Sequence, residues 1–90
     1  QAFLKAVDIV SNYSLKRLMA LYALNWTQTI VCAMTLCELQ NHSIMLLTGM
    51  KEDYIKKVKW RLKHEVFGLP KDWCLYDFLI DFQDSDIGMG

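Results

Sequence analysis

The sequence predicts an all-α fold, in the form of a compact domain of five or six helices. Apolar residues recur at steps of three and four through most of the chain, which is the spacing of one helix face. The connections between these runs are short, as in helical bundles. A chain of 90 residues forms one domain, so we expect residues 1–90 to be a single helical domain. Because Gln1 is not a natural start, we also expect a fragment of a longer chain.

The first half of the chain predicts three helices. Apolar spacing indicates them over residues 2–11, 15–25 and 28–40. Ser14 and Thr27 stand near the starts of the second and third runs, where a hydroxyl oxygen can cap each helix. The third run is apolar nearly all round, which is typical of a helix at the centre of a bundle. Its β-branched start would also suit a buried strand, and this alternative stays open at the level of sequence.

The second half predicts three more helices. Apolar spacing and punctuation indicate them over residues 44–47, 51–67 and 73–83. Ser43 and Asp72 are placed to cap the first and the last of these. Gly68 can end the long middle helix, and Pro70 prevents its continuation.

The core is expected where the central helix meets the long helix. Met34 and Cys37 should be buried in the central helix. At 100° per residue, Ile55, Val58 and Leu62 fall within one narrow sector of the long helix. We therefore expect these three side chains to pack close to Met34 and Cys37.

Charge is distributed unevenly, although the net charge is zero. Residues 51–64 carry six basic and two acidic side chains, whereas residues 65–90 carry one basic and six acidic side chains. An asymmetry of this kind concerns partners rather than fold.

The side of the long helix away from its core stripe is a candidate binding surface. Its residues are Lys56, Lys57, Trp60, Lys63, His64 and Phe67. Aromatic rings among lysines indicate a contact, either with a second packed helix or with a nucleic acid that offers bases and phosphates. An ordinary solvated face is the remaining alternative. Asp77, Asp81 and Asp84 share one face of the last helix and could complement the lysines, within the molecule or across an interface.

The sequence carries no motif for catalysis or metal binding. Cys32, Cys37, His42 and Cys74 lack the close pair that structural zinc needs, and we interpret the cysteines as core residues. Gly-rich phosphate loops and nucleophile elbows are absent from the sequence. We therefore expect no enzyme, no cofactor and no metal. The apolar runs are far shorter than the ~20 residues of a membrane span, so we expect no membrane partner, and three cysteines favour an intracellular, reducing compartment.

Residues 30–82 resemble a known family. The stretch LLTGMKEDYIKKVKWRLKHEVFGLPKDWCLYDFLIDF, with IVCAMTLCEL before it, is similar to the cyclin-like, TFIIB-like repeat of origin recognition complex subunit six. The shared pattern consists of a small residue and glycine, a tyrosine early in a long helix, an apolar-Gly-Leu step, and an aspartate and an aromatic in the last helix: Thr48-Gly49, Tyr54, Phe67-Gly68-Leu69, Asp77 and Phe82. The resemblance implies a cyclin-like fold in a nuclear replication-initiation factor that contacts DNA or another subunit. This chain has one repeat rather than two, and its charge is neutral rather than basic.

These observations predict a non-catalytic helical binding module. By the resemblance it is a piece of a replication-initiation factor. The alternative is a protein–protein interaction or oligomerisation domain unrelated to replication. We favour a protein partner or self-association over nucleic acid, because the neutral total and the acidic C-terminal region oppose binding to a polyanion.

Overall fold

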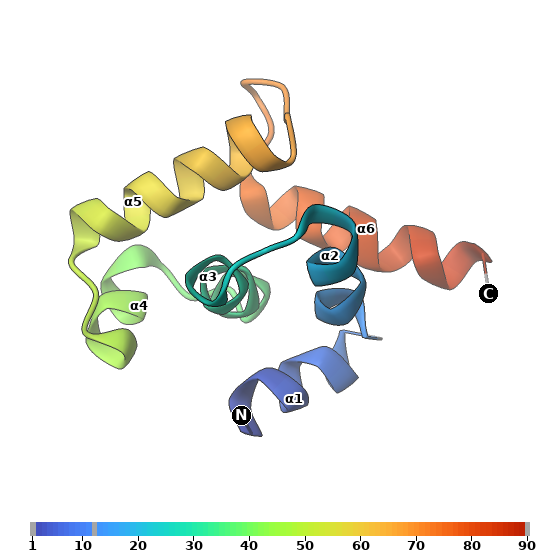
Figure 1. Cartoon of the computed structure of the whole chain (residues 1–90), viewed down its shortest axis with the longest axis horizontal. Coiled ribbons are helices and arrows are strands. Elements are labelled where there is room, and N and C mark those ends of the chain that lie inside the picture. The colour runs from blue at the N-terminus through green and yellow to red at the C-terminus, as the bar shows by residue number, and fades with distance from the viewer. Residues whose placement is uncertain (1, 12, 90) are drawn as a thin grey trace.

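Helix α3 (Trp26–Leu36) lies at the centre of the molecule, and the other helices surround it (Figure 1). A computed structural model describes residues 2–11 and 13–89, with side chains described as far as residue 84. Around α3 are α1 (Ala2–Val10), α2 (Ser14–Tyr22), α4 (Asn41–Thr48), α5 (Glu52–Arg61), the π-helical turn η1 (Leu62–Val66) and α6 (Leu75–Met89). The predicted all-α class is therefore confirmed. The radius of gyration of 12.5 Å is close to the ~12 Å expected of a compact chain of this length.

The central run forms helix α3 and not the buried strand that its β-branched residues also allowed. Other helices cover most of its sides. It packs against α1, α2, α5 and α6, and its residues 31–35 are all buried. Its start is fixed by a capping box, in which the Gln28 N–H donates to Asn25 Oδ1 at 2.8 Å and the Asn25 N–H donates to Gln28 Oε1 at 3.0 Å. The predicted cap, Thr27, is therefore wrong, because it lies within the first turn and Asn25 is the residue with the extended backbone of an N-cap.

The other predicted caps are also displaced from the helix starts. Ser14 is the first residue of α2, and its buried Oγ has no hydrogen-bond partner. Helix α4 begins at Asn41, so Ser43 lies inside its first turn. Helix α6 begins at Leu75, three residues after Asp72. A side chain caps a helix only from the position that immediately precedes its first turn, so none of these three residues can do so.

The predicted long helix is present, but its last turn is wider than an α-helical turn. After Arg61 the chain forms η1, where the Phe67 N–H donates to the Leu62 carbonyl at 2.8 Å. This bond spans five residues instead of four, so one extra residue enters the turn and changes the direction of the residues that follow it. Gly68 then takes a left-handed backbone with φ 59°, as predicted for the end of this helix.

The core forms two adjoining groups around α3. Ile55 contributes to the group that contains Met34 and Ile44, whereas Val58 and Leu62 belong to the larger group around residues 31–33. Burial of these predicted core residues of α3 and α5 is confirmed, with one exception. Cys37 is exposed, because α3 ends at Leu36 and the chain turns away at Glu38, where φ is 62°.

Aromatic rings join α2, the end of η1 and α6. Phe67 stacks on Phe78 with ring centroids 4.4 Å apart, and its ring meets that of Tyr22 edge-on at 4.7 Å. Phe78 continues the cluster toward Phe82 at 6.2 Å. The guanidinium carbon of Arg17 lies 5.1 Å from the Phe82 ring centroid, a distance at which cation–π attraction operates. These rings fix the first turns of α6 against the body of the domain.

Leu62 tests the orientation of α5 and η1, because its side chain is fully buried between them and the central helix. Leu62→Ala should lower the free energy of unfolding by about 2–5 kcal/mol in urea titrations, through lost burial and the cavity left behind. Leu46→Ala is the matched control, since Leu46 is 70% exposed and should cost less than about 0.5 kcal/mol. A loss for Leu62→Ala below about 1 kcal/mol would contradict this packing.

Candidate functional site

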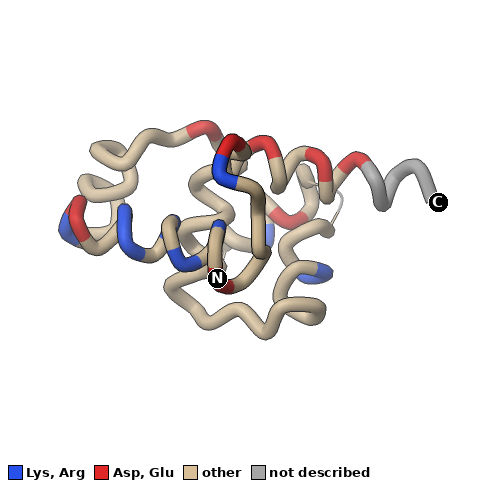
Figure 2. Tube along the Cα trace, turned by 90° about the horizontal axis from the view of Figure 1, so that it is seen from above, with Lys and Arg blue, Asp and Glu red and all other residues tan. Residues whose placement is uncertain are grey.

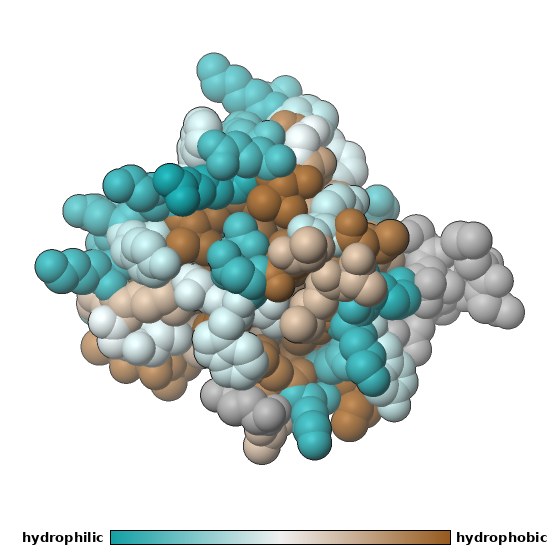
Figure 3. All heavy atoms as spheres, in the orientation of Figure 1, coloured by the Kyte–Doolittle hydropathy of each residue, from teal (hydrophilic) through white to brown (hydrophobic). Residues whose placement is uncertain are grey.

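The outer side of α5 and η1 carries lysines, a histidine and a tryptophan. Lys56, Lys57 and Trp60 are exposed, and Lys63 and His64 are half-buried. We call these five residues the basic face. Trp60 is 55% exposed, and its ring lies against the His64 ring, with centroids 4.9 Å apart. Hydrophilic side chains cover this side of α5 in the space-filling view (Figure 3). The structure thus brings five of the six predicted surface residues together on one side.

Phe67, the sixth predicted surface residue, points the other way. It is half-buried in the aromatic cluster with Phe78 of α6. The extra residue in η1 turns it out of line with Trp60. The packed-helix explanation that the sequence left open for the aromatic residues therefore applies to Phe67 and not to Trp60.

The predicted acidic face lies on α6 and does not pair with the basic face within the molecule. Asp77, Asp81 and Asp84 are all exposed. Figure 2 shows basic positions along α5 and acidic positions along α6 as two separate strips. Among the side chains that the structure describes, no ion pair joins these three carboxylates to a lysine of α5. Both charged surfaces are therefore open to other molecules.

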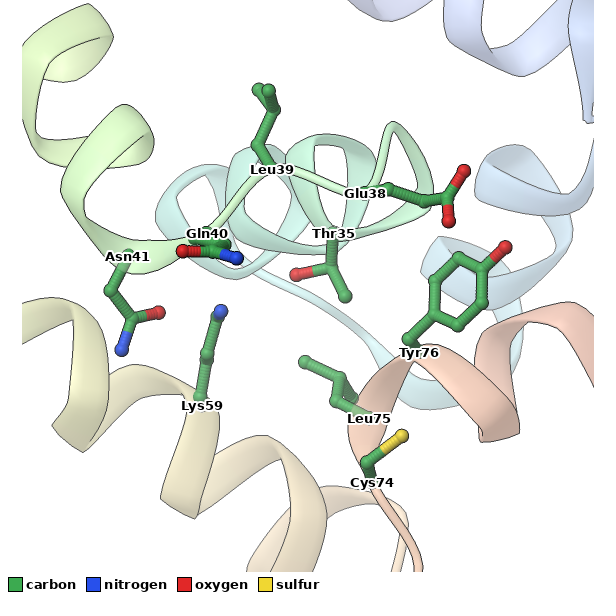
Figure 4. A pocket seen from close by; sticks show the side chains of 9 residues that line it. All are labelled: Thr35, Glu38, Leu39, Gln40, Asn41, Lys59, Cys74, Leu75 and Tyr76. Atoms are coloured by element: carbon green, nitrogen blue, oxygen red, sulfur yellow. The ribbon is translucent and has the colours of Figure 1, made fainter.

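Lys59 is a functional candidate that the sequence reasoning missed. It lines a cleft of about 490 Å³ between the end of α3, the start of α4, α5 and the start of α6 (Figure 4). The residues around this cleft are Thr35, Glu38, Leu39, Gln40, Asn41, Lys59, Cys74, Leu75 and Tyr76. A signal was present in the sequence: Lys59 follows Ile55 by four residues, which places it about 40° from Ile55 and at the border of the core stripe.

The cleft combines opposite charges with a polar atom that lacks a partner. Burial lowers the pKa of Lys59, because desolvation penalises its ammonium form. Asn41 Oδ1 is buried and has no hydrogen-bond partner. The carboxylate of Glu38 lies on the far side of Thr35 from Lys59 (Figure 4). Groups arranged in this way can bind a polar ligand.

The cysteines do not all lie in the core, which corrects their interpretation from sequence. Cys32 is buried, whereas Cys37 and Cys74 are exposed. Cys37 follows the last turn of α3, and Cys74 precedes the first turn of α6, where its Sγ accepts from the Asp77 N–H at 3.4 Å. In the part of the chain that the structure describes, no three His, Cys, Asp or Glu residues gather as metal ligands would.

Large apolar side chains also remain outside the core, and sequence periodicity did not separate them from core residues. Trp26 and Trp73 are 55% and 40% exposed, and Leu46 and Leu47 of α4 are exposed as well. Apolar side chains gather over α4 in Figure 3. Within the described residues, no helix has both the length and the apolar character that crossing a bilayer requires.

The fold and the surface define a class: a small all-α domain with an exposed basic helix face and a polar cleft beside it. Comparisons with protein-family models, curated proteins and solved structures found no match for this chain.

Thiol reactivity should separate the three cysteines. Burial raises the pKa of Cys32 to about 12, so at about pH 8 its thiol is both neutral and inaccessible. A thiol-specific disulfide reagent should therefore modify two thiols rapidly and the third only in denaturant. Cys37→Ser and Cys74→Ser should each remove one rapid reaction. Three rapid reactions in the folded protein would contradict the burial of Cys32.

Replacement of Lys59 by an apolar residue should stabilise the fold. Lys59→Met removes a desolvated charge, and it should raise the free energy of unfolding at neutral pH by roughly 0.5 kcal/mol, since solvent screens a half-exposed group. Because the pKa of Lys59 is lowered in the folded state, this advantage should fade as the pH rises toward the ordinary value of 10.5. Lys57→Met, on the exposed side, is the control for losing one lysine. If urea titrations show that Lys59→Met is less stable, polar groups around the ammonium offset its desolvation and this prediction is wrong.

Proposed function

We propose that this chain is a non-catalytic helical binding module whose basic face binds an acidic protein surface. Trp60 carries the proposal. This residue is more than half exposed and lies among lysines, and its ring contacts the His64 ring. Tryptophan is enriched in the residues that dominate protein interfaces, where its large apolar area is buried and positive charges around it select the partner.

The charge of the whole chain supports a protein partner. Ten basic and ten acidic side chains give no net attraction to a polyanion. Glu52 and Asp53 lie exposed in the first turn of α5, so the end of the basic helix would repel a continuous row of phosphates. A protein surface needs only a local match of charge. Asp77 and Asp81 of a second copy would provide one, so self-association is the simplest form of this proposal.

Nucleic acid is the second candidate, and Trp60 favours it for a different reason. An exposed aromatic ring can stack on a base while neighbouring lysines contact the phosphates. This candidate agrees with the resemblance of residues 30–82 to a replication-initiation factor. We propose that parent protein, with its nuclear setting, on the sequence pattern alone. The position of α3 among five other helices supports a cyclin-like arrangement.

Charge reversal on the basic face distinguishes the two partners. If the partner is an acidic protein surface, Lys56→Glu with Lys63→Glu should weaken self-association, measured by sedimentation, by about tenfold or more through like-charge repulsion. Asp77→Lys with Asp81→Lys in the same chain should then restore it. Trp60→Ala should weaken assembly to a similar degree, because an interface loses its largest apolar anchor.

The matched control is Lys5→Glu with Lys16→Glu, which makes the same change of charge at exposed lysines of α1 and α2. It should leave assembly unchanged. If the face binds DNA instead, the Lys56 and Lys63 reversal should abolish binding to a fluorescent oligonucleotide and leave the oligomeric state as it was. If neither assembly nor DNA binding responds, the basic face is simply solvated and the proposed function is wrong.

A further inference from the structure

The cleft beside α5 places a lysine and an amide together on one side. In Figure 4 the Lys59 side chain extends from α5 toward Gln40 and Asn41 at the start of α4. Leu75 adds apolar surface to the lining, whereas the Leu39 side chain points away from the cleft (Figure 4) and packs against the core group of Met34 and Ile44. Three separate segments of the chain therefore build this cleft: residues 35–41, Lys59 and residues 74–76.

Lys59 lacks an anion in the structure. The positive charge is half-buried, and no carboxylate among the described residues lies within ion-pair distance of it. A partly desolvated ammonium gains most from an anionic group that approaches it closely. The cleft leaves room for such a group, since its volume is about 490 Å³.

Asn41 adds a requirement for a hydrogen-bond donor. Its Oδ1 atom is buried and has no partner, and a buried acceptor without a donor costs free energy. A bare carboxylate or a fully ionised phosphate has no N–H or O–H to offer. A peptide that carries the carboxylate does, because each of its residues except proline has a main-chain N–H.

Glu38 limits how much negative charge the cleft accepts. Its carboxylate lies on the other side of Thr35 from Lys59, near Tyr76 (Figure 4). A ligand with one negative charge can therefore reach Lys59 and keep its neutral part toward Glu38. A second negative charge at that end would be repelled.

We infer that this cleft binds the carboxylate side chain of an acidic peptide segment, with Lys59 holding the carboxylate and Asn41 Oδ1 accepting a main-chain N–H. Leu75 contacts the methylene groups of the bound side chain. The inference rests on the proposed function, because it gives the acidic protein partner an anchoring point. Lys56 and Lys63 flank Lys59 along the same helix, at the spacings of neighbouring side chains on a helix surface. One acidic segment can thus fill the cleft and continue along the basic face.

The test is a titration of the isotopically labelled 90-residue chain with two blocked tripeptides, followed by amide NMR shifts. One tripeptide has glutamate between two glycines, and the other has glutamine there. The glutamate peptide should give saturable shifts at the Asn41 side-chain amide and in the first turn of α4. The glutamine peptide should bind at least about tenfold more weakly, since it cannot form the charge-assisted bond to Lys59.

Three variants locate the binding. Lys59→Gln should lower the affinity for the glutamate peptide by about tenfold or more. Lys59→Arg keeps the charge, so its affinity should remain within about threefold of that of the unchanged chain. Lys16→Gln removes an exposed lysine of α2 that does not line the cleft, and it should leave this affinity unchanged within about twofold, because an exposed charge contributes little. Equal affinity for the two tripeptides, or an unchanged affinity in Lys59→Gln, overturns the inference.

Sodium acetate distinguishes a peptide site from a simple anion site. The glutamate peptide should saturate the shifts at a lower concentration than acetate does, because acetate has no N–H for Asn41. Equal saturation by both would show an adventitious ion site and overturn the inference. The inference can fail while the proposed function holds. If reversal of Lys56 and Lys63 abolishes assembly but no peptide binds at Lys59, only the inference about the cleft is refuted.

Discussion

The structure depends on the burial of one helix on nearly all sides. Residues 31–35 of α3 are buried without a break, so no single partner can cover this helix, and α1, α2, α5 and α6 pack around it. A short chain buries a smaller fraction of its surface than a long one, so its helices cannot be covered on all sides. Each surrounding helix therefore turns one side inward and presents the other to solvent. The basic face of α5 and the acidic face of α6 follow from this division, because both helices give their apolar sides to α3.

The turn between α5 and α6 decides which aromatic residues belong to the core. The bond from the Phe67 N–H to the Leu62 carbonyl adds a residue to the last turn, and Phe67 then meets Phe78. Trp60, in the last turn of α5, stays outside. The aromatic contacts also fix the start of α6 near α3, where Leu75 and Cys74 border the cleft of Lys59. A packing feature thus separates the exposed surface from the core and shapes the cleft between them.

Sequence periodicity predicted the all-α class, the order of the helices and the burial of Ile55, Val58 and Leu62, because all of these depend on spacing. Caps were predicted poorly, since a cap depends on the backbone at one position, as Asn25 shows in place of Thr27. The exposure of Cys37 followed from the early end of α3 at Leu36. The π turn has the same apolar spacing as an α-helix, so no pattern distinguished it. The cleft of Lys59 brings together three segments that are distant in the sequence, and local spacing does not indicate such long-range contacts.

All three tryptophans lie at least 40% exposed, at positions 26, 60 and 73. Tryptophan is highly buried in most proteins, and its emission usually reports the loss of the core on unfolding. Here the indole rings are already in contact with water in the native state. Intrinsic fluorescence of this domain should therefore change less on unfolding than that of a protein with buried tryptophans, and it should respond to a partner that covers the surface. The fluorescence of Trp60 can therefore report the binding of another molecule to α5.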